Sequence, residues 1–337
     1  MKKKDCYINT EKIFEQRRVN DKLRQSMHIN EVYKKIPAIE DIEQKMKNNS
    51  SEFFQFIESG ENNEGRFLEY KKKSLDLQRQ RAELLFENNY PIDYLNKQYE
   101  CADCEDTGFI GTKMCKCYKK VLSEEFLKSS NLDTVYKNQT FKNFDLSFYS
   151  DEKNLQGVSE KDKMKTLVDY CRKYVQKFDK QKQNLLFMGT PGSGKSFLSC
   201  AIGVELINNG YFVIYTPIQN MISVFEAEKF GKSGHDTDTD TYLDCDLLII
   251  DDLGTEFQTQ FSDTVLYNVI NTRINSKKPM IISTNLTSDE LQGTYHDRLS
   301  SRLIYDFSKM AFIEKDIRRE KGIRKREKAK LKSNSGE

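Results

Sequence analysis

The sequence lacks any apolar run long enough to cross a membrane. A membrane-spanning helix needs roughly 18 consecutive apolar residues, and charged residues make up 31% of this 337-residue chain. The basic start at residues 2–4 is not followed by the apolar stretch of a signal peptide. We therefore expect a cytoplasmic protein with no membrane segment, a compartment in which disulfides are rare.

Prolines are also few, at five, and no internal repeat is visible, so domain boundaries must come from changes in pattern. Apolar residues at three- and four-residue steps predict a helix between residues 31 and 47, and a second is expected over 66–88. We predict a helical N-terminal domain over residues 1–95. An exposed apolar stripe would make it a docking surface, whereas helices packing on one another explain the same pattern.

Charge is unevenly distributed, although the net charge is only +2. Ten basic and three acidic residues lie between Lys315 and Lys332. Such an excess suits contact with nucleic-acid phosphates, and a solvated terminal helix explains it equally well. We assign residues 321–337 to a basic C-terminal tail.

Apolar strands and helices alternate from residue 184 onward. Strands are expected over 184–188, 211–215, 247–250, 280–283 and 310–313. This alternation predicts a mainly parallel sheet flanked by helices, that is, an α/β domain. We place that domain at residues 140–320, joined to the preceding segments by a linker over 121–139.

An eight-residue phosphate-binding loop follows the first of these strands and precedes a helix. Its glycines allow backbone turns that point successive N–H groups into one concavity. Lysine supplies positive charge to the β- and γ-phosphates of ATP, and the final hydroxyl coordinates Mg²⁺. The complete match in this context argues against a glycine-rich turn that binds nothing. The loop consists of Gly189, Thr190, Pro191, Gly192, Ser193, Gly194, Lys195 and Ser196.

Two carboxylates end the strand that begins at Leu247. Asp251 is expected to orient Mg²⁺, and Asp252 to polarise the water that attacks the γ-phosphate. Asn285 follows the next strand, where its amide either helps to hold that water or serves as a polar turn residue. Together with the loop, these residues predict an ATPase.

Arg298 and Arg302 lie four residues apart and so share one helical face. Surface salt bridges are one interpretation. The other is an arginine that acts on the nucleotide of a neighbouring subunit, an effect worth about 10³ to 10⁵ in rate.

Four of the eight cysteines crowd into a short segment, which we delimit as residues 96–120. Two close pairs of thiolates suit a structural zinc ion with tetrahedral coordination. The second pair has a spacing shorter than the common one, so an outside ligand such as His28 is an alternative, as are redox chemistry and unliganded thiols. The predicted zinc ligands are Cys101, Cys104, Cys115 and Cys117.

Together these motifs resemble AAA+ ATPases of the branch that contains bacterial replicative helicase loaders of the DnaC and DnaI type and transposition helper ATPases of the IstB type. The similarity is carried by the strings 246–256, 283–286 and 298–303. It implies an AAA+ P-loop ATPase fold, preceded by the mainly helical domain with its small zinc-binding segment.

The resemblance also implies roles for individual residues. Asn285 corresponds to sensor 1, Arg302 to the arginine finger with Arg298 supporting it, and Arg318 to sensor 2. Phe144 belongs to the segment that borders the adenine. Many AAA+ proteins carry Glu where this chain has Asp252, so we expect slow, switch-like turnover. We expect no helix-turn-helix domain of the DnaA initiator type after Arg318.

The function implied by this resemblance is that of an ATP-dependent helicase loader in DNA replication. Its expected partners are a hexameric replicative helicase, held through the N-terminal region, single-stranded DNA, and further copies of the chain that meet at the ATP site. One alternative is a transposition helper ATPase that binds duplex DNA and a transposase. Another is an adaptor that uses ATP only as a structural ligand.

Overall fold

The computed structural model describes residues 2–59, 64–132, 138–231 and 239–334, with side chains described as far as residue 326. Part of the predicted linker (133–137) and the end of the predicted tail (335–337) lie outside these ranges. The chain forms two compact units. Residues 11–115 make the helical unit, and residues 1–10 together with 116–337 make the α/β unit. Apart from the linker, the finer boundaries predicted above remain predictions.

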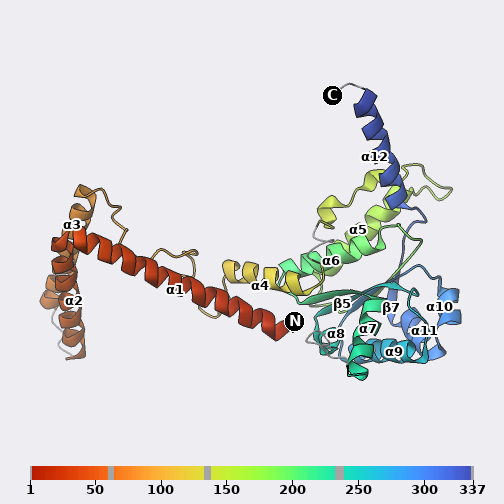
Figure 1. Cartoon of the computed structure of the whole chain (residues 1–337), viewed down its shortest axis with the longest axis horizontal. Helices are drawn as coiled ribbons and strands as arrows, with labels where there is room; N and C mark the ends of the chain where they lie inside the picture. The colour runs from red at the N-terminus through yellow and green to blue at the C-terminus, as the bar shows by residue number, and fades with distance from the viewer. Residues whose placement is uncertain (1, 60–63, 133–137, 232–238, 335–337) are drawn as a thin grey trace. The chain divides into compact units, whose positions relative to one another are not determined.

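Long helices build the helical unit. They are α1 (Lys3–Lys35), whose first residues belong to the α/β unit, α2 (Pro37–Glu58) and α3 (Glu64–Glu87). The single helix expected over 31–47 is divided, because Pro37 starts a new helix at its first position, where the missing proline N–H costs nothing. In Figure 1, α2 and α3 lie side by side.

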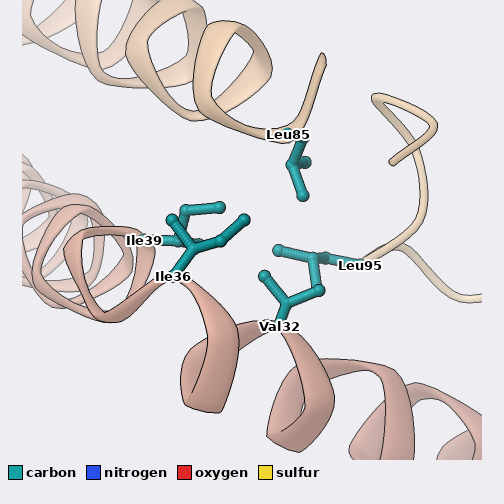
Figure 2. Packing of buried hydrophobic residues seen from close by; sticks show 5 residues of the cluster. All are labelled: Val32, Ile36, Ile39, Leu85 and Leu95. Carbon is teal, nitrogen blue, oxygen red and sulfur yellow. The ribbon is translucent and has the colours of Figure 1, made fainter. Parts of the chain in front are cut away.

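A small apolar core closes the junction of these three helices. Val32, Ile36, Ile39, Leu85 and Leu95 converge there from α1, α2, α3 and the segment that follows α3 (Figure 2). Val32, Ile39 and Leu85 are fully buried. This part of the predicted apolar stripe therefore packs helix against helix, as the simpler interpretation expected.

A parallel sheet forms the centre of the α/β unit. Within the described residues its strand order is β4-β5-β6-β3-β7, and each neighbouring pair is parallel. The apolar runs of the central strands are buried on both faces, as expected for parallel strands covered by helices. The strands are β3 (Asn184–Met188), β4 (Val213–Pro217), β5 (Leu247–Leu253), β6 (Met280–Thr284) and β7 (Phe307–Ala311).

Helices cover both faces of this sheet, which confirms the predicted fold class. In Figure 1, α5 and α6 lie on one side, and α7 and α9 lie on the other. None of the described helices is both long and apolar enough to cross a membrane. The helices of the unit are α4 (Lys116–Ser129), α5 (Glu160–Gln176), α6 (Lys195–Asn208), α7 (Ile218–Lys229), α8 (Asp240–Asp244), α9 (Gln260–Asn275), α10 (Ser288–Thr294), α11 (Asp297–Tyr305) and α12 (Ile317–Asn334).

Residues 121–129, expected in a linker, instead belong to helix α4 (Lys116–Ser129) of the α/β unit. Phe126 is fully buried between the rings of Tyr7 and Phe212, with centroids at 5.8 and 5.3 Å. Ser123 Oγ donates to the carbonyl of Ile207 on α6 at 2.9 Å. The helix is therefore part of the packed unit, because its apolar side faces the sheet domain rather than water.

Candidate nucleotide-binding site

A cavity of about 390 Å³ lies at the carboxyl ends of the strands in the α/β unit. Open parallel sheets bind ligands at this edge. Most of the residues predicted for ATP binding line it, namely Phe144, Pro191, Gly192, Gly194, Lys195, Ser196, Asp251, Asp252, Asn285 and Arg318. Gly189, Thr190 and Ser193 belong to the same loop but are not among the lining residues. The structure thus brings together side chains that are far apart in the sequence.

The loop between β3 and α6 has the backbone that a phosphate cradle needs. Gly194 caps α6 with a φ of +103°, a conformation that L side chains rarely adopt. Gly192 has a φ of +78°, and a Cβ atom there would lie 2.1 Å from Oδ1 of Asp316, so a larger residue would be strained and would displace that carboxylate. The first N–H groups of α6 and its positive dipole end therefore face the cavity, an arrangement that suits an anion.

Lys195 is buried at the base of this loop, with 4% of its surface exposed. Its Nζ donates to the carbonyls of Gly189 at 2.7 Å and Thr190 at 2.9 Å, and to Oδ1 of Asn285 at 2.7 Å. Burial lowers the pKa of Lys195, while Asp252 and Asp251 act in the opposite direction. Because these three hydrogen-bond partners are neutral oxygens, the ammonium charge is available to a phosphate.

Asp251 is the best-connected carboxylate of the site. Its Oδ1 accepts from Ser196 Oγ at 3.1 Å and from the hydroxyl of Ser283, and its Oδ2 accepts from Tyr215. Carboxylate and hydroxyl oxygens are the ligands that Mg²⁺ prefers. The adjacent oxygens of Ser196 and Asp251 therefore fit the predicted magnesium site.

Asp252 lies at an irregularity in the sheet. The register between β5 and β6 shifts between Ile250 and Leu253, and Asp252 adopts a φ of +57°. Its N–H donates to Ser283 Oγ at 3.0 Å. Bulges of this kind re-aim a side chain, and Asp tolerates the left-handed conformation better than most residues do. The half-buried carboxyl lines the cavity, and burial together with the charge of Asp251 raises its pKa.

Aromatic rings form the opposite wall of the cavity. Phe144 follows the short 3₁₀ helix η1 (Phe141–Asn143), and its ring packs on Phe197 at 5.4 Å and on Tyr149 at 6.1 Å. Phe148, in 3₁₀ helix η2 (Leu146–Phe148), lines the same wall. Sequence reasoning named only Phe144 here. The wall provides apolar faces on which a purine ring can stack.

Arg298 and Arg302 do not line this cavity. Both lie on α11, where Arg302 pairs with Asp306 at 2.9 Å and donates to Oδ1 of Asn271 at 3.1 Å. Arg318, in the first turn of α12, does line it. The structure therefore separates the two α11 arginines from the site of their own chain, and their catalytic roles stay predictions.

Tyr215 and Ser283 are the main site residues that sequence reasoning missed. Tyr215 lies inside the apolar strand β4, where a tyrosine is typical of ordinary packing. Ser283 was within the quoted string 283–286, but nothing in the sequence shows that its hydroxyl connects Asp251 with the backbone of Asp252.

The four clustered cysteines come together as predicted. Their sulfur atoms all lie within 4.8 Å of one another, and Cys101 Sγ is 3.8 Å from Cys115 Sγ. A tetrahedral site with Zn–S bonds of about 2.3 Å has sulfur atoms about 3.8 Å apart. A short hairpin of β1 (Phe109–Ile110) and β2 (Lys113–Met114) lies between the two pairs. The donor set fits a structural zinc site.

His28 is not a member of this group. Its ring stacks on Tyr94 with centroids 4.1 Å apart, and its Nδ1 lies 3.1 Å from the carbonyl of Tyr94. The alternative of a histidine ligand at position 28 is therefore wrong for this structure.

A family model described as "IstB-like ATP binding protein" matches residues 124–329. The chain belongs to this family. Membership in the IstB-like family confirms the predicted ATP-binding domain, its ATPase fold and the branch that the motifs resemble. The matched range contains the phosphate loop, the strand with Asp251 and Asp252, and both α11 arginines.

Curated relatives of this IstB-like chain match part of its length. The replicative helicase loader DnaC of Escherichia coli (strain K12) is 27% identical over 135 residues, which cover 40% of this chain and 55% of that protein. The match thus spans about half the length of that relative. DnaC of Buchnera aphidicola subsp. Baizongia pistaciae (strain Bp) is 24% identical over 187 residues, covering 55% and 71%. A crystal structure of the DnaC helicase loader is 23% identical, covers 51% of this chain and 98% of that one, and has a TM-score of 0.41.

Proposed function

We propose that this IstB-like ATPase loads a replicative helicase during DNA replication. Support comes first from the site, where Lys195, Ser196, Asp251 and Asp252 meet at the carboxyl edge of the sheet. It comes second from relatives whose names are "Replicative helicase loader DnaC". A role in bacterial replication implies a cytoplasmic location.

The chain's own residues account for ATP hydrolysis in this proposal. The N–H groups at the start of α6 and the ammonium of Lys195 hold the β- and γ-phosphates. Ser196 and Asp251 would hold Mg²⁺, which would supply positive charge next to the phosphate oxygens. Asp252 accepts a proton from the attacking water, which Asn285 helps to orient. Arg318 reaches the phosphates from α12.

Turnover in this site is slow. Asp252 has a shorter side chain than Glu, and its left-handed backbone directs the carboxyl into the cavity from the bulge in β5. A general base contributes about 10² to 10⁴ in rate only when it reaches the water. A poorly reaching base favours a long-lived ATP state, which suits a switch between two assemblies.

Self-association completes the site. Arg302 and Arg298 stand on α11, outside the cavity of their own chain. In an assembly through the ATP site, α11 of one copy supplies these arginines to the γ-phosphate of the next. Assembled copies also line up basic residues, including those of the predicted tail, for contact with the phosphates of single-stranded DNA.

The N-terminal region, predicted as residues 1–95 with the zinc segment 96–120, holds the helicase. Its second and third helices leave large apolar side chains in solvent, among them Phe54 at 64% exposure and Leu68 at 62%. Exposed apolar side chains of this size are typical of protein-binding surfaces. Zinc bound by the four thiolates would stabilise the segment 96–120.

Co-purification with the replicative hexameric helicase of the same organism tests this function. The full chain is mixed with the helicase with and without ATP, and with and without a zinc chelator. We expect a complex with the intact chain. If docking does not require nucleotide, the Lys195→Ala variant forms the same complex. Absence of a complex under every condition would contradict the proposed function.

A transposition helper is the second candidate, because the matching family is described as IstB-like. Such a protein would bind duplex DNA in the presence of ATP. Parallel titrations with labelled single-stranded and duplex DNA of equal length separate the two candidates. Preference for the duplex, combined with no helicase complex, would favour the transposition role.

A further inference from the structure

Glu256 is a carboxylate that the proposed chemistry does not use. It follows β5 in the motif string 246–256, and only 8% of its surface is exposed. Burying a carboxylate is costly unless hydrogen bonds compensate for the lost water. Both of its oxygens are satisfied: Oε2 accepts the N–H of Gly254 at 2.8 Å, and Oε1 accepts the hydroxyl of Tyr295.

Tyr295 is the other half of this link and is 3% exposed. It directly follows α10 and stands two residues before α11 begins at Asp297. Burial and the neighbouring Glu256 raise the pKa of Tyr295 well above its ordinary value, so the phenol stays protonated and donates. A neutral phenol thus bonds a buried carboxylate, and charge-assisted bonds of this kind are among the stronger ones in proteins.

The Gly254 end of the link is fixed to the catalytic edge of the sheet. Gly254 lies two residues after Asp252 and has a φ of +98°. A Cβ atom there would lie 2.7 Å from Cδ1 of Leu286, the residue after Asn285. Thr284 Oγ1 also donates to the carbonyl of Leu253 at 2.7 Å. A shift of the Asp252 segment therefore carries Gly254 and Glu256 with it.

The Tyr295 end is fixed to the helix that carries the two separated arginines. Leu299 and Leu303 of α11 are fully buried, so the helix moves as a packed element. Arg298 and Arg302 project from this same helix. One short chain of contacts thus joins the residues around the γ-phosphate position to α11.

We propose that Glu256 and Tyr295 are positioning residues that couple the Asp252 segment of one subunit to the arginines it presents to its neighbour. The inference rests on the proposed sharing of the ATP site between subunits. Its consequence is that the nucleotide in one subunit influences hydrolysis in the next through this carboxylate–phenol pair.

Mixed assemblies of two full-length variants test the coupling. The acceptor chain carries Arg302→Ala, so it keeps its own Asp252 but lacks the proposed arginine finger. The donor chain carries Asp252→Asn, is silent in its own site and keeps the finger. Phosphate release is measured for an equimolar mixture and for each chain alone. Release by the mixture that exceeds the sum of the two separate values shows that an arginine of the donor acts on the ATP site of the acceptor.

Tyr295→Phe is then added to the donor chain only. We expect phosphate release by the mixture to fall about tenfold, as for loss of one positioning hydrogen bond. The fall should be in kcat, with KM for ATP unchanged. The matched control is Tyr305→Phe in the donor, which removes a phenol hydroxyl at the end of α11, from a residue that is 78% exposed. This control should leave the release unchanged.

Each outcome has a defined meaning. If the starting pair shows no complementation, the shared site fails, and the coupling fails with it. If the starting pair complements and the Tyr295→Phe donor is equally active, the coupling alone is overturned. If Tyr295→Phe lowers the melting temperature of the donor, Glu256→Gln is the second variant. The glutamine amide has one oxygen in place of the two that accept from Gly254 and Tyr295, so one of these hydrogen bonds is lost or weakened. A Glu256→Gln donor with full activity would likewise overturn the proposal.

Discussion

The hydroxyl of Ser196 lies 3.1 Å from Oδ1 of Asp251. This contact joins the first turn of α6 to the end of β5 across 55 positions of sequence. Both oxygens are hard ligands, and the phosphate loop is on the same side of the sheet. The pair is therefore the centre of the proposed magnesium site, beside the phosphate loop and Asp252.

Replacing Ser196 with Ala should weaken magnesium-dependent nucleotide binding about tenfold or more, because one ligand oxygen is lost. Titration of a fluorescent ATP analogue at several Mg²⁺ concentrations measures the effect. Ser199→Ala is the matched control on the same helix, because the buried Ser199 Oγ has no hydrogen-bond partner in the described structure. Equal affinity of wild type and Ser196→Ala at every Mg²⁺ concentration would argue against the magnesium site.

Asp252→Asn should leave ATP binding within a factor of about two while lowering hydrolysis about tenfold or more, since an amide cannot accept the proton from water. Equilibrium binding and single-turnover phosphate release measure the two effects separately. The same experiment tests the adaptor alternative, in which ATP is only a structural ligand. Unchanged hydrolysis in Asp252→Asn would remove Asp252 from the mechanism.

Hydrolysis should depend on pH through Asp252. Burial and the charge of Asp251 raise the pKa of Asp252, so its carboxyl becomes protonated at a higher pH than an ordinary aspartate. Because the base must be ionised, kcat falls on acidification, and the fall begins above the usual aspartate range. A kcat profile that stays flat through that range would contradict this assignment.

The raised pKa of Asp252 also affects the stability of the fold, which should decrease with rising pH whereas kcat increases. A raised native pKa means that the fold binds a proton more tightly than the unfolded chain does. The stability contributed by protonated Asp252 is full below its unfolded pKa and is lost as pH rises through the raised value. At neutral pH, Asp252→Asn should therefore raise the melting temperature slightly. A lower melting temperature would indicate a structural role for the charge.

Purified protein should contain about one zinc ion per chain, held by the four thiolates. Cys101→Ser should release it, and a chelator should expose the segment 96–120 to proteolysis. Metal analysis provides the readout, with Cys171→Ala as control, a buried thiol on α5 outside the cluster. Full zinc content in Cys101→Ser would mean that another residue completes the site.

Phe126→Ala tests whether α4 belongs to the α/β unit. Deleting a fully buried aromatic ring should cost about 3–5 kcal/mol of the free energy of unfolding. Lys120, exposed on the same helix, supplies the control Lys120→Ala, for which little change is expected. Denaturant titration followed by ATP binding measures the unfolding of this unit. A negligible change for Phe126→Ala would place the helix outside the cooperative core.

Local sequence signals predicted the elements of the site that lie within one stretch of chain. The phosphate loop was visible because glycines, lysine and serine occupy fixed positions between a strand and a helix. The pairs around Cys101 and Cys115 were visible through their spacing. Parallel strands whose carboxyl ends share one edge then allowed Asp251 and Asn285 to be assigned to the same cavity.

Contacts across strands could not be predicted in the same way. The link from Ser283 to both Asp251 and Asp252 depends on the register of β5 and β6, which includes a shift at the bulge. The partner of Glu256 is 39 positions away and is fixed by the packing of α10 and α11. The helix boundary at Pro37, by contrast, could have been predicted from the proline itself. It was missed because the apolar periodicity continues through residues 31–47.

Binding between the full-length chain and the purified hexameric replicative helicase of the same organism tests the central claim most directly. Light scattering after size-exclusion chromatography, in Mg²⁺ and ATP, gives the mass of any complex. A loader predicts one complex of defined stoichiometry, with Lys195→Ala altering its nucleotide dependence. Two separate peaks, unchanged by ATP at micromolar concentrations of both proteins, would contradict the assignment.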